Sequence, residues 1–262
     1  MVQQVLASRK YRSVAPDLVA QLAAQELAKG RSLRQAVKAV KNQLHQSAGA
    51  YQAGAMSYDR WLDELREAYT AGEPEALQQV LRRILAAHAS TRERLPFLEA
   101  FYTEIFALLP PVRSVLDVAC GLNPLARPWM PLPATVPYLG LDIYQDQMAF
   151  IKEFFALADL AGDARAHNVL AGLPSGVYDL VLLLKTLPCL EQMDRHASQR
   201  LLDQVTAPNL VISFPRRSLG GRAKGMDAHY GEYFAALWQD RPGQVTRLDF
   251  PNELVFVVTG YV

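Results

Sequence analysis

Four short apolar segments after residue 110 limit the fold more than any other feature. They lie at residues 113–118, 136–141, 178–184 and 209–214. Stretches of helical periodicity follow the last three segments, at about residues 145–160, 190–205 and 226–239. Short apolar strands that alternate with helices predict the α/β class, with a mostly parallel, doubly wound sheet.

The two ends of the chain differ from this pattern. Residues 244–249 and 253–258 flank a turn at Pro251, and they predict a final antiparallel pair of strands. Residues 1–105 carry apolar side chains at helical spacing, and Pro110 follows the last helical stretch. We therefore expect an all-helical N-terminal domain over residues 1–105 and an α/β domain over residues 106–262.

Acidic residues stand at the ends of the first two predicted strands. Asp117 precedes the loop that contains Gly121, and Asp142 follows about 25 residues after Asp117. Ligands of open α/β sheets bind outside the carboxyl ends of the strands, where a carboxylate in the position of Asp142 can hydrogen-bond ribose hydroxyls. Gly121 lets the backbone approach such a ligand closely. The pattern predicts a nucleoside-binding site.

The same loop indicates which nucleoside binds. A dinucleotide site would show GxGxxG, which brings a pyrophosphate onto a helix N-terminus. This loop has a single glycine, and Pro124 follows it. A nicotinamide-dependent oxidoreductase is therefore disfavoured, and the pattern favours a nucleoside without phosphates, of which S-adenosylmethionine is the common one. A loop glycine and a surface aspartate without a ligand remain the alternative.

Charge is distributed unevenly along the chain. The net charge of the whole chain is +1, but residues 1–50 contain eight Lys and Arg against two Asp and Glu, a net +6. A basic end on a nearly neutral protein indicates a local anionic partner, or a solvated helix surface.

Other sequence features exclude several protein classes. The two cysteines, Cys120 and Cys189, form no CxxC pair and have no histidine at ligand spacing, so we expect neither a metal site nor a disulfide framework. The first residues lack the apolar stretch of a signal peptide, and no apolar run is long enough to span a bilayer. A soluble, cytoplasmic protein without membrane contact is the expectation.

Four stretches together resemble the aminoglycoside-resistance 16S rRNA (guanine-N7) methyltransferases of the Arm/Rmt/Sgm type. They are HASTRERL at 88–95, VLDVACGLNPL at 115–125, KTLPCLE at 185–191 and SFPRRSLGGRAKGM at 213–226. Shorter matches lie at residues 8–12, 44–45 and 49–51. The matches run in order over nearly the whole chain, and the 213–226 stretch is long and unusual.

The resemblance implies a class I, Rossmann-like, S-adenosylmethionine-dependent methyltransferase domain behind a helical N-terminal extension that docks on the ribosome. It implies methylation of N7 of guanosine 1405 (rRNA numbering), in the decoding A site of 16S rRNA within the 30S subunit. This modification confers aminoglycoside resistance. We expect a monomer whose partner is 16S rRNA in the 30S subunit.

The resemblance also assigns site residues. We expect the cofactor to contact Arg92, Asp117, Ala119, Gly121, Asp142, Ile143, Asn168, Val169 and Leu184. Arg92 would meet the methionine carboxylate as a charge-assisted pair, and Asp142 would hold the ribose. The family often has an acid at the position of Asn168, near the adenine, so the amide here is expected to change the strength of binding.

RNA contacts are expected on two segments. The expected RNA-binding residues are Arg9, Lys10, Arg34, Lys41, His45, Arg216, Arg217 and Lys224. Guanine N7 attacks without deprotonation, so no general base is expected. N7 of a paired guanine lies in the deep major groove of RNA, so we expect the base to flip out and stack on an aromatic side chain. The expected target-positioning residues are Tyr51, Phe214, Arg222 and Met226, with Tyr230 as a further aromatic candidate.

Two other functions remain open from the residues. One is a methyltransferase for a different RNA site, including adenine N1 in the same decoding helix, although the 213–226 stretch argues against the adenine enzymes. The other is a non-catalytic RNA-binding protein on the same fold, which loss of Gly121 or Asp142 would have favoured; both are present.

Overall fold

The centre of the molecule is a mixed β-sheet. The computed structural model describes residues 1–52, 54, 56–217 and 225–262, and in these residues seven strands form one sheet in the order β3-β2-β1-β4-β5-β7-β6. The strands are β1 Val115–Val118, β2 Tyr138–Asp142, β3 Gly162–Ala166, β4 Leu180–Leu184, β5 Asn209–Pro215, β6 Gln244–Phe250 and β7 Glu253–Thr259. Only β7 runs antiparallel to its neighbours, β5 and β6. The predicted parallel sheet and the final antiparallel pair are confirmed.

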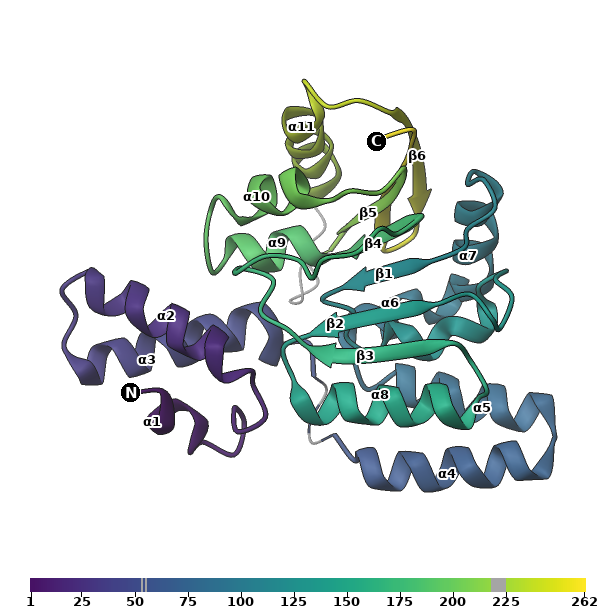
Figure 1. The fold of residues 1–262 in the computed structure, drawn as a ribbon, viewed down its shortest axis with the longest axis horizontal. Helices are drawn as coiled ribbons and strands as arrows, with labels where there is room; N and C mark the ends of the chain where they lie inside the picture. Colours follow the sequence, from purple (N-terminus) through teal and green to yellow (C-terminus); the bar gives the residue numbers. More distant parts are fainter. Residues whose placement is uncertain (53, 55, 218–224) are drawn as a thin grey trace.

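Helices cover both faces of this sheet (Figure 1). One face carries α9 Thr186–Glu191, α10 Ala197–Gln204 and α11 Met226–Trp238. The other carries α4 Tyr58–Ala71, α5 Pro74–Leu85, α6 Ala89–Arg94, η2 Leu95–Phe97, α7 Leu98–Ala107, η3 Asn123–Trp129 and α8 Gln145–Leu157. The strand order reverses between β1 and β4, which leaves a crevice at their carboxyl ends.

The first helices form a lobe beside the sheet, at the left of Figure 1. This lobe contains α1 Val2–Leu6, α2 Pro16–Ala28, α3 Leu33–Leu44 and the π-helical turn η1 His45–Gly49. Proline at the first position starts α2, and a capping box between Ser32 and Gln35 starts α3. The small core of the lobe includes Ile143 and Tyr144, which directly follow β2. The lobe is therefore attached to the loop that carries Asp142.

The helices of residues 58–107 pack differently from this lobe. Leu65 of α4, Ile84 of α5 and Phe101 of α7 share one core with residues of the sheet and of α8. The helical character expected for residues 1–105 is confirmed. The domain boundary at residue 105 stays a prediction, because the second half of the helical region shares its core with the sheet.

Two expectations about single elements were wrong. The strand β3 was not predicted, because only Ala164 of its five residues is buried and Asp163 pairs with Lys152 and Arg165 at the surface. The single helix expected at about residues 190–205 is two helices, α9 and α10. They are separated by a turn in which the Asp194 carboxylate accepts a hydrogen bond from the backbone amide of His196.

Candidate functional site

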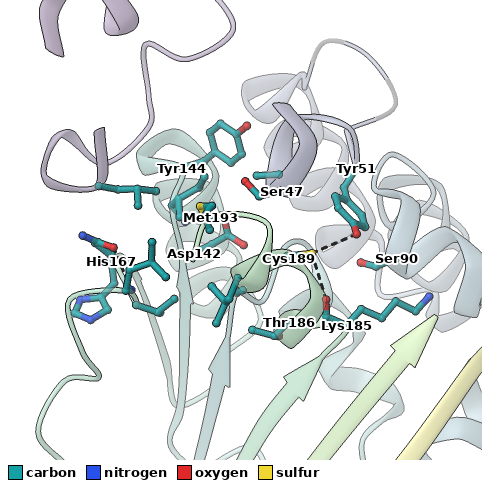
Figure 2. Close-up of a pocket in the computed structure, with 18 of the residues that line it drawn as sticks. Ser47, Tyr51, Ser90, Asp142, Tyr144, His167, Lys185, Thr186, Cys189 and Met193 are labelled. Carbon is teal, nitrogen blue, oxygen red and sulfur yellow. Dashed lines mark hydrogen bonds between the residues drawn. The ribbon is translucent and has the colours of Figure 1, made fainter. Parts of the chain in front are cut away.

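A pocket lies at the carboxyl ends of β1, β2 and β4, where the strand order reverses (Figure 2). It encloses about 750 Å³ of atom-free space, part of it open to solvent. The sheet contributes Ala119, Asp142 and Leu184, and the N-terminal half of the chain contributes Ser47 and Tyr51. The N-terminal lobe and the sheet therefore build this pocket together.

Asp142 is held by the backbone of two loops. Its Oδ2 accepts a hydrogen bond from the amide of Gly121 at 2.9 Å, and its Oδ1 accepts one from the amide of Ile143 at 2.7 Å. Burial raises the pKa of Asp142, and the hydrogen bonds from Gly121, Ile143 and Tyr144 counteract this rise. A carboxylate oxygen accepts more than one hydrogen bond, so Asp142 can still accept hydrogen bonds from ligand hydroxyls.

The loop after β1 turns sharply. Ala119 and Gly121 both have positive φ, +54° and +53°. A Cβ atom on Gly121 would lie 2.9 Å from His88 Cε1, so the positive φ favours glycine here and the close approach of His88 leaves no room for a side chain without a shift of His88.

Asp117 lies beneath this loop and does not line the pocket. It is buried, and its Oδ2 accepts hydrogen bonds from Tyr138 Oη at 2.6 Å and Asn123 Nδ2 at 2.9 Å. Burial raises its pKa to about 6, against the opposing effect of these two hydrogen bonds and of Arg94. In this structure Asp117 stabilises the loop from below.

A buried ionic network extends from the pocket to the last strand. Lys185, which has a positive φ of 57° and lines the pocket, places its Nζ 2.8 Å from Glu93 and 3.4 Å from Glu253. Glu253 also accepts hydrogen bonds from Arg94 and from Ser213, both at 2.6 Å. Burial would raise the pKa of Glu253, but Arg94 and Lys185 lower it below its ordinary value. This network was not predicted from the sequence.

His88 and Tyr51 form one wall of the pocket. Their rings stack with centroids 5.9 Å apart. Cys189 Sγ lies 3.2 Å from Tyr51 Oη (Figure 2). Burial, followed by the nearby Lys185, lowers the pKa of His88 to about 4, so its imidazole is neutral at neutral pH. No role was predicted for His88 from the sequence, although residues 88–95 carry part of the family resemblance.

The structure brings most of the predicted cofactor residues together. The residues that line the pocket are Ala119, Asp142, Ile143, Asn168, Val169 and Leu184. Gly121 contacts Asp142 directly. Arg92 is exposed on α6 and is not among the lining residues. The Asn168 amide donates to Gln21 Oε1 of α2 at 2.8 Å, and Asn168 Oδ1 accepts from the amide of Leu170.

The comparisons with known proteins identify the family. The sequence model of the family described as "Ribosomal RNA methyltransferase (FmrO)" matches residues 7–257. This chain belongs to the FmrO family of ribosomal RNA methyltransferases.

Relatives in this family cover nearly the whole chain. A protein of Micromonospora echinospora named 16S rRNA (guanine(1405)-N(7))-methyltransferase is 38% identical over 258 residues, which cover 98% of this chain and 94% of that protein. A protein of Serratia marcescens with the same name is 36% identical over 230 residues, with 88% and 85% covered.

Solved structures of 16S rRNA methyltransferases have the same fold. The structure of the 16S rRNA methyltransferase RmtF with S-adenosyl-L-homocysteine has a TM-score of 0.84 and 33% identity, and covers 99% of this chain and 96% of that one. The 16S rRNA methylase RmtB has a TM-score of 0.78 and 30% identity, with 99% and 96% covered. The class I, Rossmann-like fold expected from the sequence is confirmed.

The predicted RNA-binding residues of this FmrO-family chain lie in two regions. Arg9, Lys10, Arg34 and His45 are exposed on the N-terminal lobe and Lys41 is half-buried there, with Lys10 Nζ 2.8 Å from His45 Nδ1. Arg217 is exposed after β5. Arg216 forms an ion pair with Asp227 and donates to the carbonyl of Phe250. Arg222 and Lys224 lie outside the described residues.

The predicted target-positioning residues are not gathered at one place. Tyr51 lines the pocket, and Met226 is half-buried at the start of α11. Phe214 is fully buried in the core and stacks on Tyr230 with centroids 4.9 Å apart. Only Tyr51 of these three has its side chain in the wall of the pocket. Arg222, the fourth, is outside the described residues.

The part of the chain that the structure describes has neither a membrane-spanning helix nor a metal-binding cluster. No helix there has both the length and the apolar character that a membrane crossing requires. Those residues also contain no group of three or more His, Cys, Asp or Glu side chains arranged to hold a metal ion.

Proposed function

We propose that this chain transfers the methyl group of S-adenosylmethionine to N7 of guanosine 1405 in 16S rRNA and thereby confers aminoglycoside resistance. The observation that carries this proposal is the pocket where the strand order of the sheet reverses, with Asp142 held in its wall by the amide of Gly121. The chain that forms this pocket matches a named 16S rRNA (guanine(1405)-N(7))-methyltransferase over nearly its whole length. The substrate implies action in the cytoplasm.

The residues of the pocket fit a nucleoside without phosphates. Asp142 can accept hydrogen bonds from ribose hydroxyls, and Ile143, Val169 and Leu184 offer apolar contact to a base. Lys185 is paired with two carboxylates, so it presents little net positive charge to a phosphate. Exposed Arg92 lies two residues after pocket-lining Ser90, and we assign it to the methionine carboxylate.

Methyl transfer to N7 requires orientation rather than a base. The cofactor supplies a methyl group on a cationic sulfonium, and N7 attacks with its own lone pair. Holding the two reactants in line contributes about 7–11 kcal/mol in favourable cases. The neutral His88 stacks on Tyr51 and keeps that ring at the wall of the pocket, where it can contact the acceptor base.

The charge of the product suits this pocket. N7-methylguanine is cationic, so an unpaired cation against the base would oppose the reaction. Lys185 is the one Lys or Arg among the lining residues that the structure describes, and Glu93 and Glu253 neutralise it. The paired Lys185 therefore adds no net repulsion to the developing positive charge.

The basic N-terminal lobe supplies the contact with RNA. Arg9, Lys10 and Arg34 are exposed on it, and phosphate contacts of this kind position a protein on RNA without reading the sequence. The lobe is attached to the loop after Asp142 by the hydrogen bond from Ala15 N to the carbonyl of Ile143, at 2.8 Å. We propose that a monomer docks on the assembled 30S subunit and that the target base flips out into the pocket.

The test is to incubate the protein with labelled S-adenosylmethionine and 30S subunits, and to map N7-methylguanine by borohydride and aniline cleavage. Cleavage at guanosine 1405 is expected. Label at another guanine, or at an adenine of the decoding helix, would show a different RNA target. No incorporation into 30S subunits would contradict the proposed function.

A further inference from the structure

A buried amide group in the wall of the pocket has only one of its two ends satisfied. Gln147, in the first turn of α8, is 1% exposed and lines the pocket together with Asp142. Its Oε1 accepts a hydrogen bond from Tyr58 Oη, but its Nε2 has no acceptor within the described residues. Buried donors are nearly always paired in native structures, so a donor without a partner at the wall of a pocket indicates a ligand acceptor.

Tyr58 determines which end of the amide faces the pocket. Its ring is stacked on Phe150 with centroids 5.2 Å apart and is packed edge-on by Trp61 at 5.6 Å, which fixes the position of the hydroxyl. Burial, followed by the charges of Asp146 and Asp142, raises the pKa of Tyr58 far above its ordinary value. The hydroxyl therefore stays protonated, and donation to Gln147 Oε1 leaves Nε2 free for a ligand.

The chemistry of Asp142 explains why a donor is useful beside it. A ribose hydroxyl has one proton to donate and lone pairs to accept, whereas an ionised carboxylate can only accept. A hydroxyl bound to Asp142 alone would keep its lone pairs without a donor from the protein. An amide Nε2 on the same wall satisfies this requirement without adding charge.

We propose that Gln147 is a second ribose-recognition residue, whose Nε2 donates a hydrogen bond to a cofactor hydroxyl that itself donates to Asp142, with Tyr58 as the positioning residue for the amide. This inference rests on the proposed function, since it concerns the ribose of S-adenosylmethionine. Recognition of the ribose hydroxyls would then depend on three elements: β2 through Asp142, α8 through Gln147 and α4 through Tyr58.

The experiment measures binding by isothermal titration calorimetry, with S-adenosylhomocysteine and its 2′-deoxy and 3′-deoxy analogues as the probes. Gln147→Met keeps the length of the side chain and removes the amide. We expect it to weaken S-adenosylhomocysteine about fivefold, the factor that corresponds to one neutral hydrogen bond. One of the two deoxy analogues lacks the hydroxyl that Gln147 contacts. We expect Gln147→Met and the unsubstituted protein to bind that analogue with equal affinity, because the hydrogen bond is absent in both cases.

Two further variants separate recognition from folding. Tyr58→Phe leaves Gln147 in place but removes the hydroxyl that orients its amide. We expect it to weaken S-adenosylhomocysteine by less than Gln147→Met does, and to leave the affinity for the analogue without the contacted hydroxyl unchanged. Gln43→Met removes the amide of a half-buried residue whose Oε1 is also buried without a partner among the described residues, on α3 and outside the residues that line the pocket. We expect unchanged affinity for all three probes. Thermal unfolding of each variant reports whether it is folded.

The results distinguish the role of Gln147 from the proposed function. Equal weakening of all three probes by Gln147→Met, or no weakening of any, would overturn the role of Gln147 in ribose recognition while leaving the proposed function intact. Failure of the unsubstituted protein to bind S-adenosylhomocysteine at all would instead count against the proposed function.

Discussion

The backbone amide of Gly121 donates a hydrogen bond to Asp142 Oδ2 over 2.9 Å and so joins the loop after β1 to the end of β2. The amide of Ile143 occupies the other carboxylate oxygen at 2.7 Å. Both oxygens of Asp142 are thereby oriented by the chain itself, and a ligand that binds them does not have to order the side chain. Such pre-organisation lowers the entropic cost of binding.

The first prediction concerns this carboxylate. Asp142→Asn replaces one oxygen by an NH₂ group, which in either orientation faces a backbone N–H of Gly121 or Ile143. We expect the affinity for S-adenosylhomocysteine to fall at least about tenfold, as for the loss of one or two hydrogen bonds to a charged group. Calorimetric titration measures this. The matched control is Asp163→Asn on the neighbouring β3, which should bind normally; similar affinity in both variants would contradict the role of Asp142.

The second prediction separates backbone strain from steric contact. Gly121→Ala and Gly30→Ala both place alanine at positive φ, +53° and +75°, but only at Gly121 would the new Cβ meet a neighbour, His88 Cε1 at 2.9 Å. Strain of this kind costs about 1–2 kcal/mol. We expect urea unfolding to show that Gly30→Ala lowers the free energy of unfolding by this amount only. Gly121→Ala should lower it further and should also weaken binding of the cofactor. Combining Gly121→Ala with His88→Ala should restore part of the loss. No coupling between the two substitutions would contradict the contact.

Much of the fold was predictable from residue pattern, and the exceptions have physical causes. The strands β1, β2, β4 and β5 are buried on both faces and read as apolar runs. The strand β3 lies at an edge of the sheet, where Asp163 and Arg165 pair in solvent, so its composition resembles a loop. Its existence follows from pairing with β2, which local sequence does not encode.

The site was predictable where its residues follow strands. Gly121 lies in the loop after β1 and Asp142 is the last residue of β2. Topology alone brings the ends of parallel neighbouring strands together. Contacts between distant segments were not predictable: Arg94 and Glu253 form a buried pair across 159 residues of sequence. Likewise, no local pattern distinguishes Gln147 from any other helical glutamine.

The third prediction is a pH dependence of stability due to Asp117. Burial raises its folded-state pKa from 3.8 to about 6, so the folded state binds this proton more tightly than the unfolded state. The contribution of this group therefore lowers the free energy of unfolding by up to about 3 kcal/mol as pH rises from about 4 to about 6. Above pH 6 its contribution no longer changes. Asp117→Asn has no proton to lose.

The measurement is urea unfolding of both proteins at several pH values. The stability of the unsubstituted protein relative to Asp117→Asn should decrease between pH 4 and 6 and then stay constant. Asp163→Asn serves as the control: against the effect of burial, Arg165 and Lys152 hold the pKa of Asp163 below its ordinary value of 3.8. The contribution of Asp163 to stability therefore changes only below about pH 4 and stays constant between pH 4 and 6. A constant difference between the unsubstituted protein and Asp117→Asn across this range would contradict the assignment.

The fourth prediction tests the role of Tyr51 as the aromatic contact of the target base. Tyr51→Ala removes a ring that can stack on a flipped base, a contact worth about 1–3 kcal/mol. We expect turnover on 30S subunits to fall about tenfold or more, while the affinity for S-adenosylhomocysteine falls much less. Tyr51→Phe keeps the ring and loses only the contact with Cys189, so it should retain most of the turnover. Equal methylation rates for the alanine variant and the unsubstituted protein would rule out stacking.

The fifth prediction concerns docking through the N-terminal lobe. Replacing Lys10, Arg34 and Lys41 by Glu removes three cations from one lobe. Each lost phosphate contact lowers the salt dependence of RNA binding by about 0.7–0.9 in log–log slope, so we expect weaker binding to 30S subunits and a slope reduced by about 2. The charge-matched control replaces Arg66, Arg113 and Lys152, whose side chains are 53%, 86% and 66% exposed outside this lobe. Binding to 30S subunits is measured at two salt concentrations. Docking through the lobe predicts weaker binding for the lobe variant alone. Equal weakening of the lobe variant and the control would indicate a general effect of net charge and would contradict docking through the lobe.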